Sequence, residues 1–344
     1  MLSAAANLPR REKVMHGDKV LGAIEGFYLS HILLFFRRQH IFPAFHDYAD
    51  PTVIAVERGF DAALFSALVE FVHLRTGIFR RNRKRYRLHE DLRSFYWLEF
   101  QIDKFLGAYG AVVQDLPTSL TQADLGRGLV DRRIEAAAYG EIQSPPNPLV
   151  LEEVARRSIH SLVDLGCGPG TLLGALATAD RAFRGWGLDA DQAMLDVASK
   201  MIARAGVADR ITLIKADALA AAENLSVETR RDAQAIHCKG LFDELFRTGD
   251  EKAIHFLETL RDLLPGRLLF NVDYYGKLTR VDRPGERYRH TLLHDVLQHL
   301  TAQGTPPADL GHWVEIYATA GCEVLHAYES ESNGIDWFVH VVQL

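Results

Sequence analysis

Glycines at alternate positions follow a short apolar stretch in the middle of the chain. Gly166, Gly168 and Gly170 come directly after residues 162–165, which we expect to form a buried strand, and a helix is expected after them. Glycine lacks a Cβ and tolerates positive φ, so such a turn lets the backbone pass close to a bound molecule. Asp164 precedes the turn. An acid and a glycine-rich turn at the carboxyl end of a parallel strand suit a nucleoside-bearing ligand.

Two further acids follow the next two expected strands. Asp189 ends the stretch 184–189, 25 residues after Asp164, and Asp217 comes just after the stretch 211–215. A carboxylate accepts two hydrogen bonds without donating any, which suits the two hydroxyls of a ribose. The glycine spacing is G-x-G-x-G, whereas dinucleotide sites use G-x-G-x-x-G around a pyrophosphate. We therefore expect a nucleoside-bearing ligand whose site need not bind a pyrophosphate.

The elements that would position these residues alternate between helix and strand from residue 149 onward. This alternation predicts an α/β fold with a mainly parallel, doubly wound sheet, which a late hairpin closes. The expected strands are 162–165, 184–189, 211–215, 233–238, 267–272, 323–328 and 337–342, and the expected helices are 149–157, 172–179, 192–205, 251–264 and 314–319.

The preceding part of the chain is predicted to be mainly helical, with one basic hairpin. Residues 18–46 carry apolar side chains at helical spacing, which indicates a core face or a dimer contact. In residues 58–90 a helix is followed by a strand, a turn at Asn82 and a second strand, which is the pattern of a winged helix. The Pro-rich stretch 139–148 indicates a linker. We expect a flexible tail at 1–17, a winged-helix-like domain at 18–145 and the ligand-binding domain at 146–344.

The composition is that of an ordinary globular protein. Of 344 residues, 48% are hydrophobic and 24% charged, and the net charge of −6 provides no general basic field for nucleic acid. Cys167, Cys238 and Cys322 are widely spaced and odd in number, which favours a reducing cytoplasm over a disulfide framework. Residues 1–17 lack the apolar run of a secretory signal. The most apolar stretch, 32–36, is far shorter than the ~20 residues of a membrane helix.

The ligand-binding block resembles the class I S-adenosylmethionine (SAM)-dependent methyltransferases. The resemblance rests on the glycine turn, the two acids and His237-Cys238 at the end of the fourth strand, in that order. In that family the glycine turn approaches the methionine part of SAM, the acid of the second strand binds the ribose hydroxyls, and the acid after the third strand takes the adenine amine. The resemblance implies a Rossmann-like, seven-stranded sheet. The cofactor-binding residues that it implies are Asp164, Gly166, Gly168, Gly170, Asp189, Ala190, Asp217, Ala218 and His237.

With the winged-helix-like region, nearly the whole chain is similar to two-domain methyltransferases of small molecules, which are usually dimeric. This implies a homodimer through the N-terminal domain and a natural-product precursor as substrate. Residues 107–110, 140–142 and 291–304 look like the C-methyltransferases of α-keto acids, of the 2-ketoarginine or phenylpyruvate type. C-methylation of an α-keto acid is therefore the first expectation.

The catalytic candidates lie after the fourth and fifth strands. Methyl transfer requires a positioned nucleophile, and a base helps where a proton must leave. Some keto-acid methyltransferases are thought to hold a metal through a histidine and an acid after the fourth strand and a later histidine. Phe242 stands where the first histidine is expected, which argues against a divalent metal. The expected catalytic residues are His237, Asp243, His294 and Asp295, of which Asp243 and His294 would bind a metal only if one were present, and the expected substrate contacts are Tyr139, Tyr274 and Tyr275.

Other functions remain open at this point. They are O-methylation of a phenolic or hydroxylated metabolite, C-methylation of an apolar, prenyl-type acceptor, and a SAM-sensing regulator that binds DNA through the cations of residues 80–87. Methylation of a nucleic-acid base is disfavoured because no Asn-Pro-Pro-Tyr-like turn follows the fourth strand. The expected partners are a small molecule and a second copy of the chain, without nucleic acid or membrane, in the cytoplasm.

Overall fold

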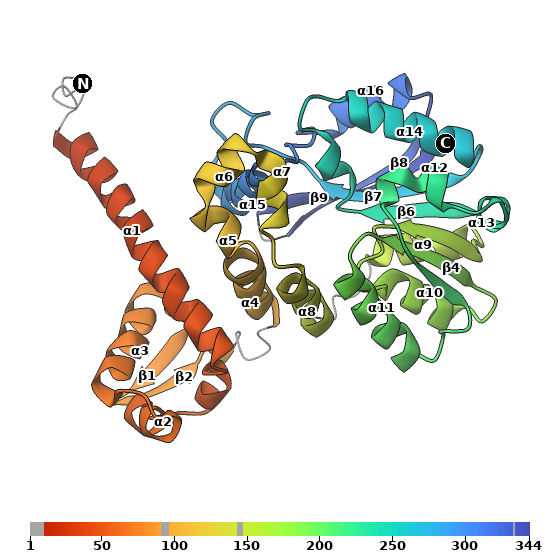
Figure 1. Ribbon diagram of the computed structural model, residues 1–344. Helices are drawn as coiled ribbons and strands as arrows, with labels where there is room; N and C mark the ends of the chain where they lie inside the picture. The colour runs from red at the N-terminus through yellow and green to blue at the C-terminus, as the bar shows by residue number, and fades with distance from the viewer. Residues whose placement is uncertain (1–9, 91–95, 143–146, 333) are drawn as a thin grey trace. The chain divides into compact units, whose positions relative to one another are not determined.

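Two capped helices and a short hairpin organise the first part of the chain (Figure 1). The computed structural model describes residues 10–90, 96–142, 147–332 and 334–344. The chain forms two units, residues 1–107 and 108–344. The elements of the first unit are α1 (Arg10–Arg38), η2 (Phe42–Phe45), α2 (Pro51–Arg58), α3 (Ala62–Thr76), β1 (Phe79–Asn82), β2 (Arg85–Leu88), α4 (Tyr96–Gln101) and a π-helical turn that runs from Ile102 to Ala108.

The order of α2, α3 and the hairpin agrees with the predicted winged helix. The side chain of Asp61 accepts a hydrogen bond from the backbone N–H of Leu64 and caps α3, and Gly77 ends that helix in the left-handed conformation. β1 and β2 pair antiparallel, and a bridge between Ala49 and Tyr86 adds a third strand segment. Two cations of the hairpin are neutralised nearby: Arg81 contacts Glu70 and Arg87 contacts Glu90, each at 2.7 Å.

Helix α1 starts earlier than predicted and leaves an apolar stripe uncovered. It begins at Arg10, so the expected tail of residues 1–17 is wrong from residue 10 onward, and residues 1–9 lie outside the described part. Val20, Leu21, Ile24, Phe27 and Tyr28 are between 53% and 62% exposed, so they are not core residues of this chain. Within the described residues, 17–38 form one helix that is long and apolar enough to cross a membrane, by length and composition alone.

The second unit contains a seven-stranded sheet in the order β5-β4-β3-β6-β7-β9-β8. The first five strands in that order run parallel, and β9 pairs antiparallel with both β7 and β8. This confirms the predicted Rossmann-like, doubly wound fold. The strands are β3 (Ser161–Leu165), β4 (Arg184–Asp189), β5 (Ile211–Lys215), β6 (Ala235–Lys239), β7 (Leu268–Tyr274), β8 (Glu323–Ser332) and β9 (Ile335–Gln343).

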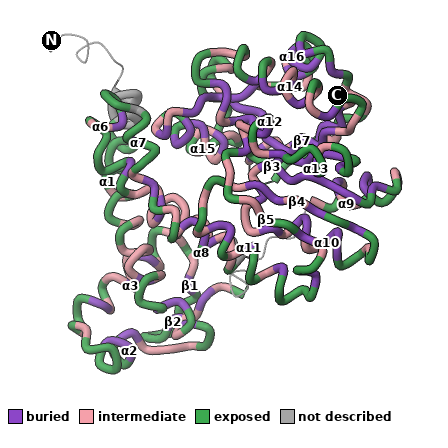
Figure 2. The backbone as a smooth tube through the Cα atoms, turned by 45° about the vertical axis from the view of Figure 1, so that its right-hand side comes forward, coloured by how far each residue is buried: buried purple, intermediate pink, exposed green. Residues whose placement is uncertain are grey.

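Helices cover both faces of this sheet, and buried positions concentrate along its strands (Figure 2). One apolar cluster includes side chains of α9 (Pro148–Arg156), α10 (Thr171–Ala179) and α11 (Gln192–Arg204). The cluster on the other face includes α14 (Glu251–Leu263) and α16 (Leu310–Thr319). Hydrophobic residues of the parallel strands therefore face apolar side chains on both sides, as buried parallel sheets require.

A set of short helices joins this sheet unit, although the sequence analysis placed the domain boundary near residue 145. A Cβ on Gly140 would lie 3.0 Å from Val197 of α11, and one on Gly126 would lie 2.6 Å from the carbonyl oxygen of Leu300. This close packing explains why the division falls after Gly107. The helices are α5 (Gly110–Gln114), α6 (Leu116–Thr121), α7 (Ala123–Gly128) and α8 (Arg132–Ile142), and α15 (Arg289–Leu300) is their neighbour.

Candidate functional site

The glycine turn after β3 has the backbone conformation that its sequence predicts. Gly166, Gly168 and Gly170 have φ values of 70°, 53° and 69°, a region that side chains rarely adopt. Gly170 starts α10, and a Cβ on it would lie 3.1 Å from Ile202. The turn therefore exposes backbone at the carboxyl end of β3 and packs closely against α11.

Asp189 holds this turn from the end of β4. Its Oδ2 accepts the backbone N–H of Gly168 and its Oδ1 accepts that of Asp191, both at 2.9 Å. Burial raises the pKa of Asp189 above the usual aspartate value, and the two backbone donors oppose that shift. Two carboxylate oxygens offer about four lone-pair sites, so Asp189 can still accept hydrogen bonds from a diol.

Asp217 follows β5 at the same edge of the sheet. Its side chain is exposed and caps the short helix η5 (Ala218–Ala220) by accepting the backbone N–H of Leu219 at 2.9 Å. Ala218 is buried and Ala190 is exposed. The turn, Asp189 and Asp217 thus end three neighbouring strands, which is the arrangement that the sequence predicted for a nucleoside.

Asp164 and His237 form a buried pair between β3 and β6. The two residues are register partners on adjacent strands, and Oδ1 of Asp164 lies 2.7 Å from Nδ1 of His237. Their side chains are only 3% and 7% exposed. We therefore assign the carboxylate of Asp164 to orienting His237, and the expectation that both residues also contact the cofactor stays a prediction.

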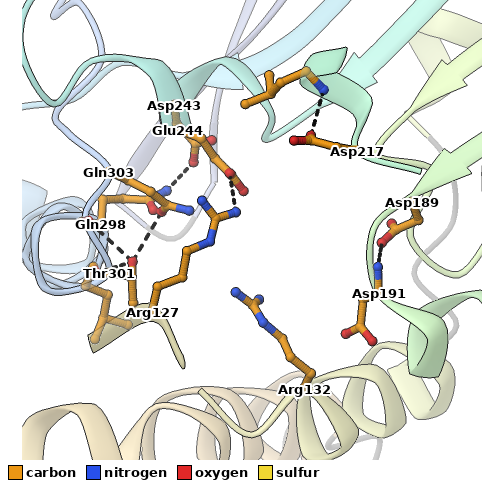
Figure 3. A network of polar contacts seen from close by, with 12 residues as sticks. Arg127, Arg132, Asp189, Asp191, Asp217, Asp243, Glu244, Gln298, Thr301 and Gln303 are labelled. Atoms are coloured by element: carbon orange, nitrogen blue, oxygen red, sulfur yellow. Dashed lines mark hydrogen bonds and ion pairs between the residues drawn. The ribbon is translucent and has the colours of Figure 1, made fainter. Parts of the chain in front are cut away.

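Figure 3 shows polar side chains on two sides of an opening at this edge of the sheet. Asp189, Asp191 and Asp217 lie on one side. Asp243, Glu244, Gln298, Thr301 and Gln303 lie opposite, and the side chains of Arg127 and Arg132 point into the space between them. We call the first group, where the sequence predicts a cofactor, the cofactor side, and the second group the acceptor side.

The acceptor side is built around the turn η6 (Phe242–Leu245), which follows β6. The amide of Gln298 donates a hydrogen bond to Oδ2 of buried Asp243. The backbone N–H of Asp243 in turn lies 3.2 Å from Oδ2 of Asp273 at the end of β7. Burial raises the pKa of Asp273 to about 7, against the effect of the two backbone N–H groups that it accepts.

Phe242 is a core residue, not a site residue. Its side chain is fully buried, and its ring packs at 5.4 Å from Phe256 and 5.9 Å from Trp313. In the part of the chain that the structure describes, no three or more histidine, cysteine or acidic side chains are grouped so that they could hold a metal ion. Asp243 and His294, the ligands expected if a metal were bound, therefore do not belong to such a group.

Asp295 and Tyr274 bind each other inside the fold. The hydroxyl of Tyr274 donates to Oδ1 of Asp295 at 2.7 Å, and Oδ2 accepts the backbone N–H groups of Lys277 and Leu278. Both side chains are buried, and burial raises the pKa of Tyr274 well above its usual value. Asp295 thus fixes the chain after β7. This geometry is against the predicted catalytic role of Asp295 and the predicted substrate contact of Tyr274.

The other predicted residues do not gather at the acceptor side. Tyr275 turns toward β8 and β9, where its hydroxyl donates to Glu329 at 2.7 Å and lies 3.3 Å from Nε2 of His340. The ring of His294 lies edge-on against Tyr274, with centroids 4.8 Å apart. Tyr139 is half-buried on α8. Only Asp243 of the predicted catalytic set lies among the acceptor-side residues of Figure 3.

Two arginines and two glutamines near the opening were not predicted from the sequence. Arg127 contacts Glu244 at 2.6 Å, and Arg132 contacts Glu135 at 2.7 Å. Gln298 lies one helical turn after His294 on α15, so both glutamines fall within the stretch 291–304. The only signal for the arginines was their place among helices that the sequence analysis assigned to the other domain.

Comparisons with known proteins agree with this geometry. Residues 162–264 match a family model described as a methyltransferase domain. The fold is similar to that of the mitomycin 7-O-methyltransferase MmcR, with 14% identity over 98% of this chain and 100% of that one and a TM-score of 0.71. A putative O-methyltransferase from Nostoc punctiforme gives 14% identity over 95% and 99% of the two chains and a TM-score of 0.75. The pyocyanin biosynthetic protein PhzM gives 16% identity over 95% of this chain and 99% of that one, with a TM-score of 0.64.

A sequence comparison with curated proteins gave no match. The family model bears out a methyltransferase domain, and similar structures that hold S-adenosylhomocysteine, those of PigF and CalO1, agree with the cofactor expected from the sequence, S-adenosylmethionine. They do not bear out the α-keto acid C-methyltransferase type.

Proposed function

We propose that this chain is a SAM-dependent methyltransferase that methylates an oxygen of a small hydroxylated molecule, of the kind found in natural-product pathways. The observation that carries the proposal is the opening between the cofactor side, with Asp189 and Asp217, and the acceptor side around η6. The similar structures named above support oxygen as the acceptor atom, because MmcR is a 7-O-methyltransferase.

The chain's residues divide the work of the reaction between the two sides. When bound, SAM supplies an activated methyl group on a sulfonium. Asp189 would hold the ribose hydroxyls, Asp217 the adenine amine, and the turn from Gly166 to Gly170 the methionine part. The negative charges of Asp189 and Asp217 also favour SAM, because the cofactor carries a net positive charge. The acceptor side would position the hydroxyl in line with the methyl, which is the main requirement of such a transfer.

C-methylation of an α-keto acid has less support. The sequence favoured it through the likeness of residues 107–110, 140–142 and 291–304, although Phe242 stands in place of a histidine that some of these enzymes are thought to use for a metal. The side chain of Phe242 lies in the core. DNA binding through the hairpin also has less support, because Arg81 and Arg87 are paired with carboxylates. Neither alternative has an observation of its own in its favour.

The function is tested with SAM carrying a labelled methyl group. Catechol and phenylpyruvate serve as one hydroxyl acceptor and one keto-acid acceptor, and mass spectrometry with NMR locates the label. We expect label in a methoxy group of the catechol product. Label on carbon of phenylpyruvate, with none on catechol, would contradict O-methylation. Failure to bind S-adenosylhomocysteine, the product form of SAM, in calorimetry would contradict the methyltransferase itself.

We further propose a homodimer through the exposed stripe of α1. Changing Leu21 and Phe27 together to lysine should convert the dimer to a monomer, because the charges would stand where apolar side chains meet. Sedimentation at matched concentrations measures this, and Lys19→Glu, at an exposed position on α1 away from the stripe, is the control. A wild-type protein that sediments as a monomer would exclude the dimer.

We also propose a cytoplasmic location, with which three free, buried cysteines agree.

A further inference from the structure

Glu244 is the residue of the η6 turn whose side chain faces the opening. Phe242, Asp243 and Leu245 of the same turn are buried, whereas the side chain of Glu244 is 21% exposed. Figure 3 shows its carboxylate beside Asp243, directed toward the space between the two sides of the site. The turn thus anchors itself in the core through three residues and offers one carboxylate to a molecule bound in the opening.

Arg127 fixes the direction of this carboxylate. Its Nη2 donates to Oε2 of Glu244 at 2.6 Å, which is a charge-assisted hydrogen bond. Helix α7, which carries Arg127, is itself held in place, because Gly126 lies against the backbone of Leu300 so closely that a Cβ would overlap it. A second pair of opposite polarity, Asp124 with Arg247 at 3.2 Å, links the same two segments. Glu244 is therefore held by α7 and not left free to swing.

The charges around Glu244 come from four elements. Arg127 on α7 and Arg132 on α8 supply two positive charges, and Arg247 follows the η6 turn. Asp243 on η6 and Asp273 at the end of β7 supply acidic groups, and Glu244 contributes to the raised pKa of Asp273. The arginines bring positive charge close to the carboxylate of Glu244, which accepts a hydrogen bond from Arg127.

We propose that Glu244 is the catalytic residue that accepts the proton of the acceptor hydroxyl, and that Arg127 is the residue that positions it. This inference rests on the proposed function and adds the proton acceptor, for which the sequence had offered the polar residues after the fourth and fifth strands, with His237, Asp243, His294 and Asp295 preferred. It also accounts for the phenylalanine at position 242, because a carboxylate two residues further along the same turn takes the place of an imidazole.

The step balances without any other reactant. An oxygen lone pair of the acceptor forms the bond to the methyl carbon while the methyl–sulfur bond breaks and its electron pair stays on sulfur. The hydroxyl proton passes to an oxygen of Glu244 and later leaves to solvent. A carboxylate suffices because the hydroxyl becomes strongly acidic as its oxygen gains the methyl group, so proton transfer accompanies bond formation.

The test compares two acceptors that differ in how readily they lose the proton. Catechol keeps its proton at about pH 8, as phenols do, whereas 4-nitrocatechol has already lost one. In Glu244→Gln the rate with catechol should fall by about 100-fold, within the usual range for a lost base. The rate with 4-nitrocatechol should fall less than about tenfold, because no base is needed for it. Glu258→Gln, an exposed glutamate on α14, is the matched control and should change neither rate.

A second measurement needs no turnover. The visible spectrum of 4-nitrocatechol reports its ionisation when it binds to the S-adenosylhomocysteine complex. Glu70 beside Tyr86 shows the effect to expect, since that phenol has its pKa raised to about 12 by burial and by its hydrogen bond to the glutamate. In the same way the bound probe should ionise at higher pH in the wild type than in Glu244→Gln. In Glu244→Asp the bound probe should ionise at a pH between those two values. In an Arg127→Gln background, the change in this pH that Glu244→Gln causes should be smaller.

The outcomes separate this inference from the proposed function. Equal losses for both acceptors in Glu244→Gln, or an unchanged ionisation of the bound probe, would overturn the role of Glu244. A wild-type protein that binds S-adenosylhomocysteine but neither binds nor methylates either catechol would overturn the acceptor position beside Glu244. Loss of S-adenosylhomocysteine binding by the wild type would instead overturn the proposed function.

Discussion

Asp189→Ala is expected to lower the affinity for S-adenosylhomocysteine by about 100-fold. The variant removes two hydrogen bonds from ribose hydroxyls to an ionised carboxylate, each contributing about 1.5 kcal/mol, and 3 kcal/mol is about two powers of ten in affinity. It also releases the backbone N–H groups of Gly168 and Asp191, which the carboxylate accepts in the free protein. Calorimetry gives the affinity, and thermal unfolding shows whether the turn has loosened.

Asp209→Ala is the matched control, because Asp209 is 79% exposed and lies in the turn before β5. Asp189→Asn separates charge from shape, since its amide keeps one acceptor oxygen but places a donor beside the other hydroxyl. It should bind S-adenosylhomocysteine nearly as weakly as the alanine variant. Affinity within about threefold of the wild type in Asp189→Ala, at unchanged melting temperature, would show that the cofactor lies elsewhere.

The pH dependence of binding follows from the same carboxylate. Hydroxyls donate to the ionised form, so the ligand binds ionised Asp189 more tightly than protonated Asp189. Burial raises the pKa of Asp189 in the free protein. Wild-type affinity should therefore weaken as the pH falls, beginning at a higher pH than an exposed aspartate would cause, and the alanine variant should lack this dependence.

The sequence predicted the positions of the glycine turn, Asp189 and Asp217 well because these residues belong to consecutive strand–turn–helix units. The glycines act through local backbone conformation, and Asp189 and Asp217 stand at the ends of strands that the alternation of elements already located. Parallel strands then bring these ends to one edge of the sheet without any further information.

Contacts between distant elements could not be predicted in the same way. Asp164 binds His237 because β3 lies beside β6, and strand order is a property of the whole sheet. Arg127 and Arg132 belong to short helices whose attachment to the sheet unit depends on close packing at Gly126 and Gly140. Neither glycine carries a signal in its own sequence neighbourhood.

The two tyrosines at the carboxyl end of β7 show a different limit. Tyr274 and Tyr275 were predicted together as substrate contacts, but consecutive residues of an extended chain face opposite sides. Tyr274 accordingly meets Asp295, whereas Tyr275 meets Glu329 and His340. Both hydroxyls have partners inside the protein, as buried tyrosines usually do. An aromatic pair next to a site therefore indicates at most one residue for the substrate.

Phe242→His is expected to destabilise the fold by about 2–3 kcal/mol, because it buries an imidazole in an apolar cluster. The ring lies against Phe256 and Trp313 and is fully buried. The penalty should grow as the pH falls below about 6.5, since the unfolded chain then gains a proton that the buried ring resists. His340 sets the precedent, because burial lowers its pKa to about 3. Urea unfolding at about pH 8 and about pH 5.5 measures both effects.

Phe242→Leu is the control for this substitution, because it keeps an apolar side chain and has no group that titrates. Its stability should fall less than that of the histidine variant, and its loss should be the same at both pH values. The comparison also tests why the predicted metal pair is incomplete. If Phe242→His were as stable as the wild type and bound a divalent metal together with Asp243 and His294, position 242 would belong to the site after all. Because the ring of Phe242 is confined to the core, only side chains of the η6 turn that point out of the core can take part in the reaction. Glu244 is the one that reaches the opening.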